Sequence, residues 1–320
     1  LLYVHRAFQG KRSSMLRMHA RLSHRPCGKE AAMSAPEPSD LQAYKIELID
    51  QAKRGGALVA GVADATAFHM APEGHRPTDL LPGAKAVFVV GGAQPRAADW
   101  RSPKAEHMET TSTSDRISAL ALKLAHHVER SFGYYALLNP PGVDRGQQPF
   151  MSLALAAELA GCGTRSLAGP VLNAEYGFMY YSALITTLPL PVDGPTEQAV
   201  CPAPECAAMW EAKNTTPCLS VCPIDDGGCL GGNLVDGKIA DSQFDRARCT
   251  IRTNGNWVPG FQKALGVALD EPDADRRKMI LSSTMFTRTL WSMTYSNVSQ
   301  AQCFECMRVC PVGAQHRELN

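Results

Sequence analysis

Two short cysteine motifs near the C-terminal end carry the strongest chemical signal in the sequence. Residues 218–223 (CLSVCP) and 306–311 (CMRVCP) are both C-x3-C-P units with the same valine before the second cysteine. Nine of the eleven cysteines in the 320-residue chain fall between positions 201 and 310. Disulfide frameworks belong to short secreted domains, so this density in a longer chain indicates ligation of a metal or a cluster.

The spacing favours iron–sulfur clusters. In bacterial two-cluster ferredoxins the run is C-x2-C-x2-C-x3-C-P, and the cysteine before proline ligates the other cluster. Thiolates are soft ligands that suit iron in such clusters. The same crossing predicts two [4Fe-4S] clusters here, each with four ligands. The first set is Cys201, Cys206, Cys218 and Cys310, and the second is Cys222, Cys249, Cys303 and Cys306.

Two alternatives stay open for these cysteines. The eleven-residue gap between Cys206 and Cys218 departs from the ferredoxin run, so Cys229 competes with Cys201 as the fourth ligand of the first cluster. Zinc also takes four thiolates, and a pair of zinc sites would use the same eight residues. Zinc ribbons usually have C-x2-C knuckles, whereas C-x3-C-P is typical of clusters, so we expect electron transfer.

The segment before the cysteines must position them, and its pattern predicts an α+β domain of the α/β sandwich kind. Apolar spacing and capping residues predict helices at 40–52, 114–133 and 153–159. Short apolar runs bounded by glycine or proline predict strands at 57–62, 86–90, 134–138 and 182–190. The order of the strands in the sheet does not follow from one sequence.

Composition changes suggest three parts of the chain. Residues 1–39 are expected to be an extension, 40–195 the α/β domain, and 196–320 a cluster-binding domain. A helical insertion is expected at about 257–300, with helices at 276–285 and 287–295. The abrupt change to cysteine, proline and glycine after position 195 is the strongest of these boundaries.

Charge and hydropathy restrict the partners. Lys plus Arg (32) nearly equals Asp plus Glu (31), so we expect no bulk binding of nucleic acid or of an anionic membrane. The sequence has no apolar run of about eighteen residues that would span a membrane. Residues 1–32 are basic, with no acid before Glu30, which predicts a targeting peptide or a reading frame extended upstream of Met33. We expect a cytoplasmic protein, or one of an organelle interior if the targeting peptide is real.

Five segments, in order, resemble one known group of proteins. They are residues 81–91 (LPGAKAVFVVG), 157–163 (AELAGCG), 173–177 (NAEYG), 188–193 (LPLPVD) and 244–249 (FDRARC). This series is similar to the epoxyqueuosine reductase and reductive dehalogenase superfamily. The resemblance implies a nitroreductase-like domain that holds cobalamin, followed by a ferredoxin-like two-cluster module. It also implies an external electron donor of ferredoxin or flavodoxin type and a small-molecule or nucleoside substrate.

The resemblance also suggests catalytic and cofactor-binding residues. Asp144 follows Val143, as does a catalytic acid of the epoxyqueuosine reductases, and would act as a proton donor; the Glu-Arg that follows in that family is absent. A solvated Asp in the turn begun by residues 140–142 (PPG) is the competing interpretation. Tyr176 and Tyr180 would line a corrin or donate a proton, and packing on a strand face is the alternative for them.

Two further sites bear on the choice of function. Thr164-Arg165 stands where the family has Gly-Lys, and His126-His127 invites assignment as a metal site. Adjacent helical residues point in different directions, so a solvated helix face is expected for the histidines. The leading hypothesis is a corrinoid-dependent iron–sulfur reductase. The alternative, motivated by the departures from the family, is a non-catalytic ferredoxin-type electron-transfer subunit that docks a redox partner.

Overall fold

The computed structural model describes residues 36–93, 103–140, 149–221, 228–245, 248, 259–284, 286 and 305–317. The chain divides into two compact units, Leu1–Pro38 and Ser39–Asn320. The helices and strands described below all belong to the second unit, except that Pro38, the first residue of helix α2 (Pro38–Arg54), is counted with the first.

A four-stranded antiparallel sheet in the order β1-β2-β7-β3 forms the centre of this unit. Its strands are β1 (Val59–Asp64), β2 (Ala86–Gly92), β7 (Tyr180–Thr186) and β3 (Ala136–Asn139). All seven residues of β2 are buried, so this strand is covered on both faces, as its continuous apolar run predicts. Phe88 pairs with Val62 on one side and with Leu184 on the other.

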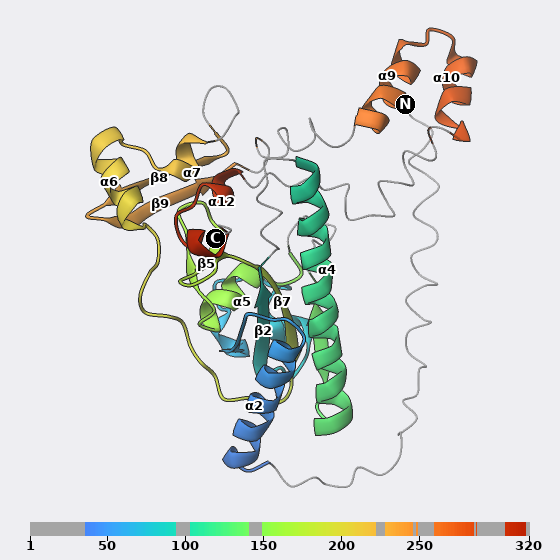
Figure 1. Cartoon of the computed structure of the whole chain (residues 1–320). Helices are drawn as coiled ribbons and strands as arrows, with labels where there is room; N and C mark the ends of the chain where they lie inside the picture. The colour runs from blue at the N-terminus through green and yellow to red at the C-terminus, as the bar shows by residue number, and fades with distance from the viewer. Residues whose placement is uncertain are drawn as a thin grey trace, which may run out of the picture. The chain divides into compact units, whose positions relative to one another are not determined.

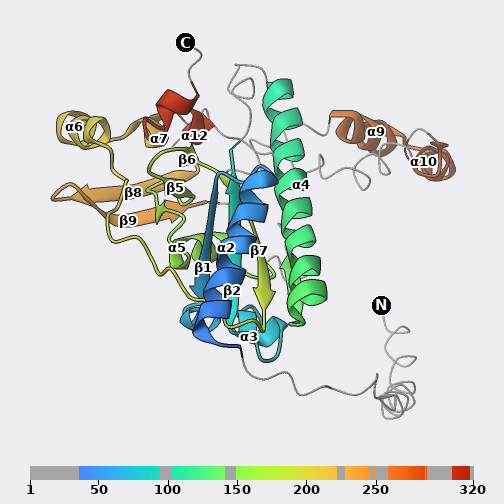
Figure 2. The same cartoon turned by 60° about the horizontal axis from the view of Figure 1, so that its bottom comes forward.

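Helices cover both faces of the sheet (Figures 1 and 2). On one face, α2 (Pro38–Arg54) and α4 (Pro103–His127) bury Leu48 and Ile117 in one core with Phe88. On the other face, α5 (Leu153–Leu159) buries Ala156 against Val87 in a second core. Successive side chains of a strand point to opposite faces, which is why Val87 and Phe88 fall in different cores.

Shorter elements complete the fold. A three-stranded sheet contains β4 (Thr164–Arg165), β5 (Val171–Asn173) and β6 (Gly177–Phe178). A hairpin of β8 (Leu230–Val235) and β9 (Lys238–Phe244) turns at Asp236 and Gly237, which both have positive φ, as expected for an Asp-Gly turn. The other helices among the described residues are η1 (Ala65–Ala67), α3 (Pro77–Leu80), η3 (Val128–Phe132), α6 (Pro204–Lys213), α7 (Pro217–Ser220), α9 (Pro259–Asp270), α10 (Ala274–Leu281), α12 (Glu305–Arg308) and η5 (Ala314–His316).

Most of the predicted elements are present, with differences in extent that include α4, β7 and α10, which ends at Leu281 rather than at 285. The long helix α4 begins at Pro103 rather than near residue 114, because its first eleven residues lack the apolar spacing on which the prediction depended. Strand β7 ends at Thr186 rather than at 190, since Pro189 and Pro191 cannot donate hydrogen bonds to a neighbouring strand. The helix predicted at 287–295 lies outside the described residues.

The mixed α/β class is therefore confirmed, with antiparallel sheets. The predicted boundary near residue 195 and its ferredoxin-like module remain predictions. Among the residues that the structure describes, none of the helices has the length and apolar character needed to cross a membrane.

Candidate iron–sulfur site

Four cysteines distant in sequence come near one another: Cys201, Cys206 on α6, Cys218 on α7 and Cys310 after α12. Burial, followed by the charges of the other three cysteines, raises the pKa of the Cys206 thiol to about 11. Burial likewise raises the pKa of the Cys201 thiol, as do Cys310 and Cys218. These are the four residues predicted to hold the first cluster.

Two sulfur atoms of this group have polar partners. The backbone N–H of Leu167 donates to Cys201 Sγ over 3.4 Å and lowers the pKa of that thiol against the larger effect of burial. The Oγ1 of Thr216 lies 3.2 Å from Cys218 Sγ. Hydrogen bonds to cluster sulfurs are among the features that tune iron–sulfur centres.

The spread of the four thiols bears on the kind of centre they fit. Within the described part of the chain, no three His, Cys, Asp or Glu side chains lie close enough together to hold a single metal ion. A single ion requires all its ligands in one shell, whereas each thiolate of a cubane cluster binds a different iron. Four thiols that interact electrostatically without forming a one-ion site are thus compatible with a cluster.

Part of the second set lies beside the first. Cys306 on α12 and Cys229 pack with Cys218 against a small buried apolar group of Ala168, Leu230 and Met307. Cys222, Cys249 and Cys303 lie outside the described residues, so the second set remains a prediction. Cys229, the rival of Cys201, thus packs in one group with a residue of each set, Cys218 and Cys306, and the choice between the two rivals stays open.

The segment after Cys310 docks on the turn between β5 and β6. A Cβ on Gly313 would lie 2.4 Å from Gly177 N, and one on Gly177 would lie 2.3 Å from Val312 O, so glycine is needed at both positions. Gln315 Nε2 donates to Glu175 O over 3.1 Å. This backbone contact fixes Cys310 relative to the α/β sandwich.

A strap of residues 193–200 brings Cys201 to the site. Asp193 accepts from Lys45 Nζ over 2.5 Å and from Val62 N over 2.8 Å. Further along, Thr196 Oγ1 donates to Gly161 O over 3.1 Å, and Val200 N donates to Thr164 Oγ1 over the same distance. The strap is therefore held to the sandwich from its start to the residue before Cys201.

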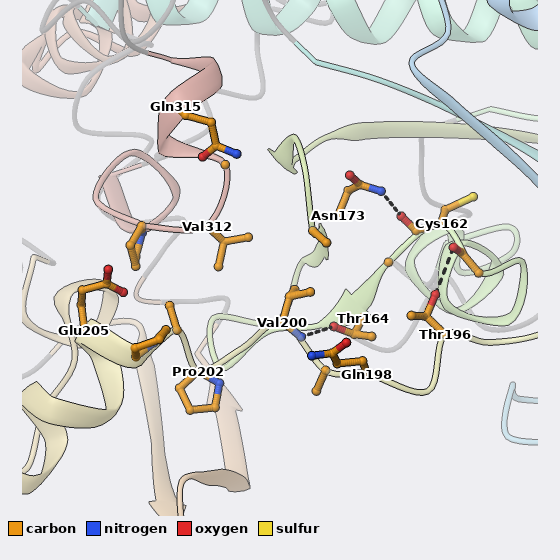
Figure 3. Close-up of a pocket in the computed structure, with 18 residues that line it drawn as sticks. Cys162, Thr164, Asn173, Thr196, Gln198, Val200, Pro202, Glu205, Val312 and Gln315 are labelled. Atoms are coloured by element: carbon orange, nitrogen blue, oxygen red, sulfur yellow. Dashed lines mark hydrogen bonds between the residues drawn. The ribbon is translucent and has the colours of Figure 1, made fainter.

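A cavity of about 640 Å³ lies between this strap, the α5–β4 turn and the segment after Cys310 (Figure 3). Most of its described lining residues are small or apolar, and Glu205 is the one carboxylate among them. Several of its polar groups are already bonded within the chain: Asn173 Nδ2, for example, donates to Cys162 O over 3.0 Å. The cavity adjoins the cysteine group through Pro202 and Pro311, which follow Cys201 and Cys310.

The two tyrosines suggested for corrin binding do not line the described part of this cavity. Tyr176 stacks near His316, with ring centroids 4.8 Å apart, and Tyr180 contacts Phe178 edge-on at 5.1 Å; neither lines the cavity. Asp144 lies outside the described residues. The suggested acid and the two tyrosines therefore remain predictions.

Three other polar groups, His127, Cys162 and Tyr181, have clear surroundings. His127 Nε2 lies 2.7 Å from Glu47 Oε1 and 2.9 Å from Gln51 Nε2, so it joins α4 to α2 and is only partly exposed. The neighbouring His126 is exposed, so the expected solvated helix face holds for His126 and not for His127. Cys162 lines the cavity, and burial raises the pKa of its thiol to about 12 and keeps it protonated. Burial also raises the pKa of the nearby Tyr181, whose hydroxyl has no hydrogen-bond partner among the described residues.

Two contacts at the cysteine group were missed from the sequence. Leu167 acts through its backbone N–H, and because every residue except proline has one, the residue type gives no sign of this contact. The contact of Thr216 could have been found from the sequence. Thr-Pro-Cys is typical of a helix start, and it places the threonine hydroxyl two residues before Cys218.

Comparison with known proteins gives solved structures only. No protein-family model matches the chain, and no curated protein matches it in sequence. A catabolic reductive dehalogenase aligns with 17% identity and a TM-score of 0.50, over 85% of this chain and 38% of that one. An epoxyqueuosine reductase in complex with a modified tRNA stem loop aligns with 19% identity and a TM-score of 0.49, over 89% of this chain and 68% of that one. The epoxyqueuosine reductase from Bacillus subtilis aligns with 20% identity and a TM-score of 0.47, over 88% of this chain and 68% of that one.

At 17% identity, the alignment with the dehalogenase bears on the fold alone, and the chain spans only 38% of that protein's length. The chain has the fold found in the reductive dehalogenases, so the resemblance inferred from its motifs is confirmed at the level of the fold.

Proposed function

We propose that the chain is an iron–sulfur oxidoreductase that passes electrons through two [4Fe-4S] clusters to reductive chemistry on a small molecule. The observation that carries this proposal is the convergence of Cys201, Cys206, Cys218 and Cys310, which the C-x3-C-P pattern had grouped. When bound, a cubane cluster supplies one-electron transfer at a potential that its surroundings set.

The protein's own groups would hold this cluster in a partly dry environment. Desolvation is the largest influence on the Cys201, Cys206 and Cys310 thiols. Raised thiol pKa values mean that ligation must displace protons, so cluster assembly is favoured as pH rises. The strap and the Gly177–Gly313 contact supply the rigid support that a cluster needs for electron transfer.

The corrinoid that the resemblance implies does not fit the described cavity. A cavity of about 640 Å³ is in the range of pockets that bury drug-sized ligands. A whole corrinoid is much larger than such a ligand, so the described lining does not hold it, and we derive no step through it. Cobalamin binding remains a proposal, whose direct test is the corrinoid content of the purified protein.

A second function has its own supporting observation. Where the family has Gly-Lys, Arg165 binds Glu158 Oε2 over 2.6 Å and Gly169 O over 3.0 Å, and Thr164 is occupied by the strap. These two residues therefore make contacts within the chain and are not free to bind a cofactor. This favours a ferredoxin-type electron-transfer subunit, which docks a redox partner and needs no corrinoid. In both cases we propose an external donor of ferredoxin or flavodoxin type, a cytoplasmic or organelle-interior location, and no bulk binding of nucleic acid.

Purification without oxygen, followed by turnover assays, separates the two functions. The reductase predicts bound corrinoid or another small acceptor, and reduction of halogenated phenols or epoxide-bearing nucleosides by the isolated chain with an artificial reductant. The electron-transfer subunit predicts reducible clusters, no turnover by the isolated chain, and a stable complex with a redox partner. A colourless, iron-free protein that contains zinc would reject both.

A further inference from the structure

Thr216 begins α7 and is buried, with only 1% of its surface exposed. A threonine at a helix start usually accepts a hydrogen bond from the backbone N–H groups of the first turn. Thr216 makes no such bond. Its hydroxyl instead lies 3.2 Å from Cys218 Sγ, and this is the contact its side chain makes in place of a cap.

Ligation fixes the direction of this hydrogen bond. A cysteine that binds iron is a thiolate without a proton, so the hydroxyl must donate and the sulfur must accept. Leu167 N–H donates in the same way to Cys201 Sγ over 3.4 Å. Two of the four sulfurs of the proposed first cluster thus face buried donors from different parts of the chain.

We propose that Thr216 is a positioning residue that raises the reduction potential of the first cluster through its hydrogen bond to Cys218. The inference rests on the proposed cluster at the four cysteines. Reduction adds a negative charge that spreads onto the thiolate sulfurs, and a donor to one of those sulfurs stabilises the reduced state more than the oxidised state. Burial strengthens the effect, because little water competes for the sulfur.

The main test is Thr216→Val, which keeps the shape of the side chain and removes the hydroxyl. At a fixed potential, we expect the ratio of reduced to oxidised first cluster to fall about tenfold, which is a shift of about 59 mV for a one-electron couple. Thr216→Ser should restore the wild-type value. Ser220→Ala is the matched control, because it removes an exposed hydroxyl of the same helix that donates to Pro217 O rather than to sulfur.

Redox titration followed by EPR gives the result, with iron analysis of every variant. An iron-free wild-type protein would refute the proposed function itself. A fully loaded Thr216→Val protein with an unchanged potential would overturn only the role of Thr216. If that variant binds no iron, the test is electron–nuclear double resonance of the reduced wild-type protein after transfer to D2O. A hydroxyl-type deuterium coupling at the cluster supports the inference, and its absence overturns it.

Discussion

The clamp between Lys45 and Asp193 should contribute measurably to stability, because it holds the strap that leads to Cys201. Lys45 Nζ lies 2.5 Å from Asp193 Oδ1, with the two side chains 10% and 38% exposed. Asp193 Oδ2 also accepts from Val62 N over 2.8 Å. Asp193→Ala would leave an almost buried ammonium and a backbone N–H without these partners.

The expected cost of Asp193→Ala follows from this exposure. Removing one partner of a fully buried pair costs about 3–5 kcal/mol, and an exposed pair contributes about 0–1 kcal/mol. Because water still reaches Asp193 but hardly reaches Lys45, we expect a loss of about 2–3 kcal/mol. Asp193→Asn keeps an acceptor for Val62 N–H and should cost about half as much, since only the charge is lost.

Urea unfolding of the metal-loaded proteins measures these losses, with the same cluster content in every sample so that ligand linkage cancels. Lys45→Met completes a double-mutant cycle, in which we expect about 1–2 kcal/mol of coupling between the two positions. A loss below about 0.5 kcal/mol for Asp193→Ala, or costs that simply add, would refute the idea that the pair acts as a clamp.

Three further predictions concern cluster content and pH. Cys201→Ser should lower iron by about four per chain, whereas Cys229→Ser should leave the first cluster intact; iron and sulfide analysis checks this, and the opposite pattern would make Cys229 the ligand. Gly313→Ala should displace the segment after Cys310 and reduce iron content, because the new Cβ would lie 2.4 Å from Gly177 N. Its control, Gly237→Ala, has a similar positive φ with nothing within 4 Å, and equal effects of the two would contradict the clash. Burial raises the pKa of Cys162 from 9.0 to about 12, so its contribution to stability is complete below pH 9 and is lost as pH rises toward 12. Between these values the unfolding free energy of wild type should fall faster than that of Cys162→Ala, by up to about 1.4 kcal/mol per pH unit in urea titrations, and parallel curves would disprove it.

Local patterns were sufficient to predict the sandwich. Apolar spacing with a clear cap defined α5 as Leu153–Leu159, and a continuous apolar run defined β2. The short strands β4, β5 and β6 were not predicted, because two or three residues cannot establish a period of two. The hairpin of β8 and β9 was also missed, although Asp236-Gly237 is a strong turn signal.

The cysteine group was predicted in part. The C-x3-C-P repeat grouped Cys218 with Cys310 across more than ninety residues, because cluster ligands follow a crossing rule rather than local spacing. The sequence could not choose between Cys201 and Cys229, because the path of the strap before Cys201 depends on tertiary contacts of Asp193, Thr196 and Val200. Such contacts join residues over 30 positions apart and leave no periodic trace in the sequence.

The most direct test of the central claim is the content of iron and acid-labile sulfide in protein purified without oxygen, measured together with zinc. Two cubane clusters predict about eight irons and eight sulfides per chain, with EPR signals of reduced [4Fe-4S] centres. Replacing Cys206 or Cys310 by serine should remove about half of this iron. About two zinc ions per chain, without sulfide and without colour, would contradict the account.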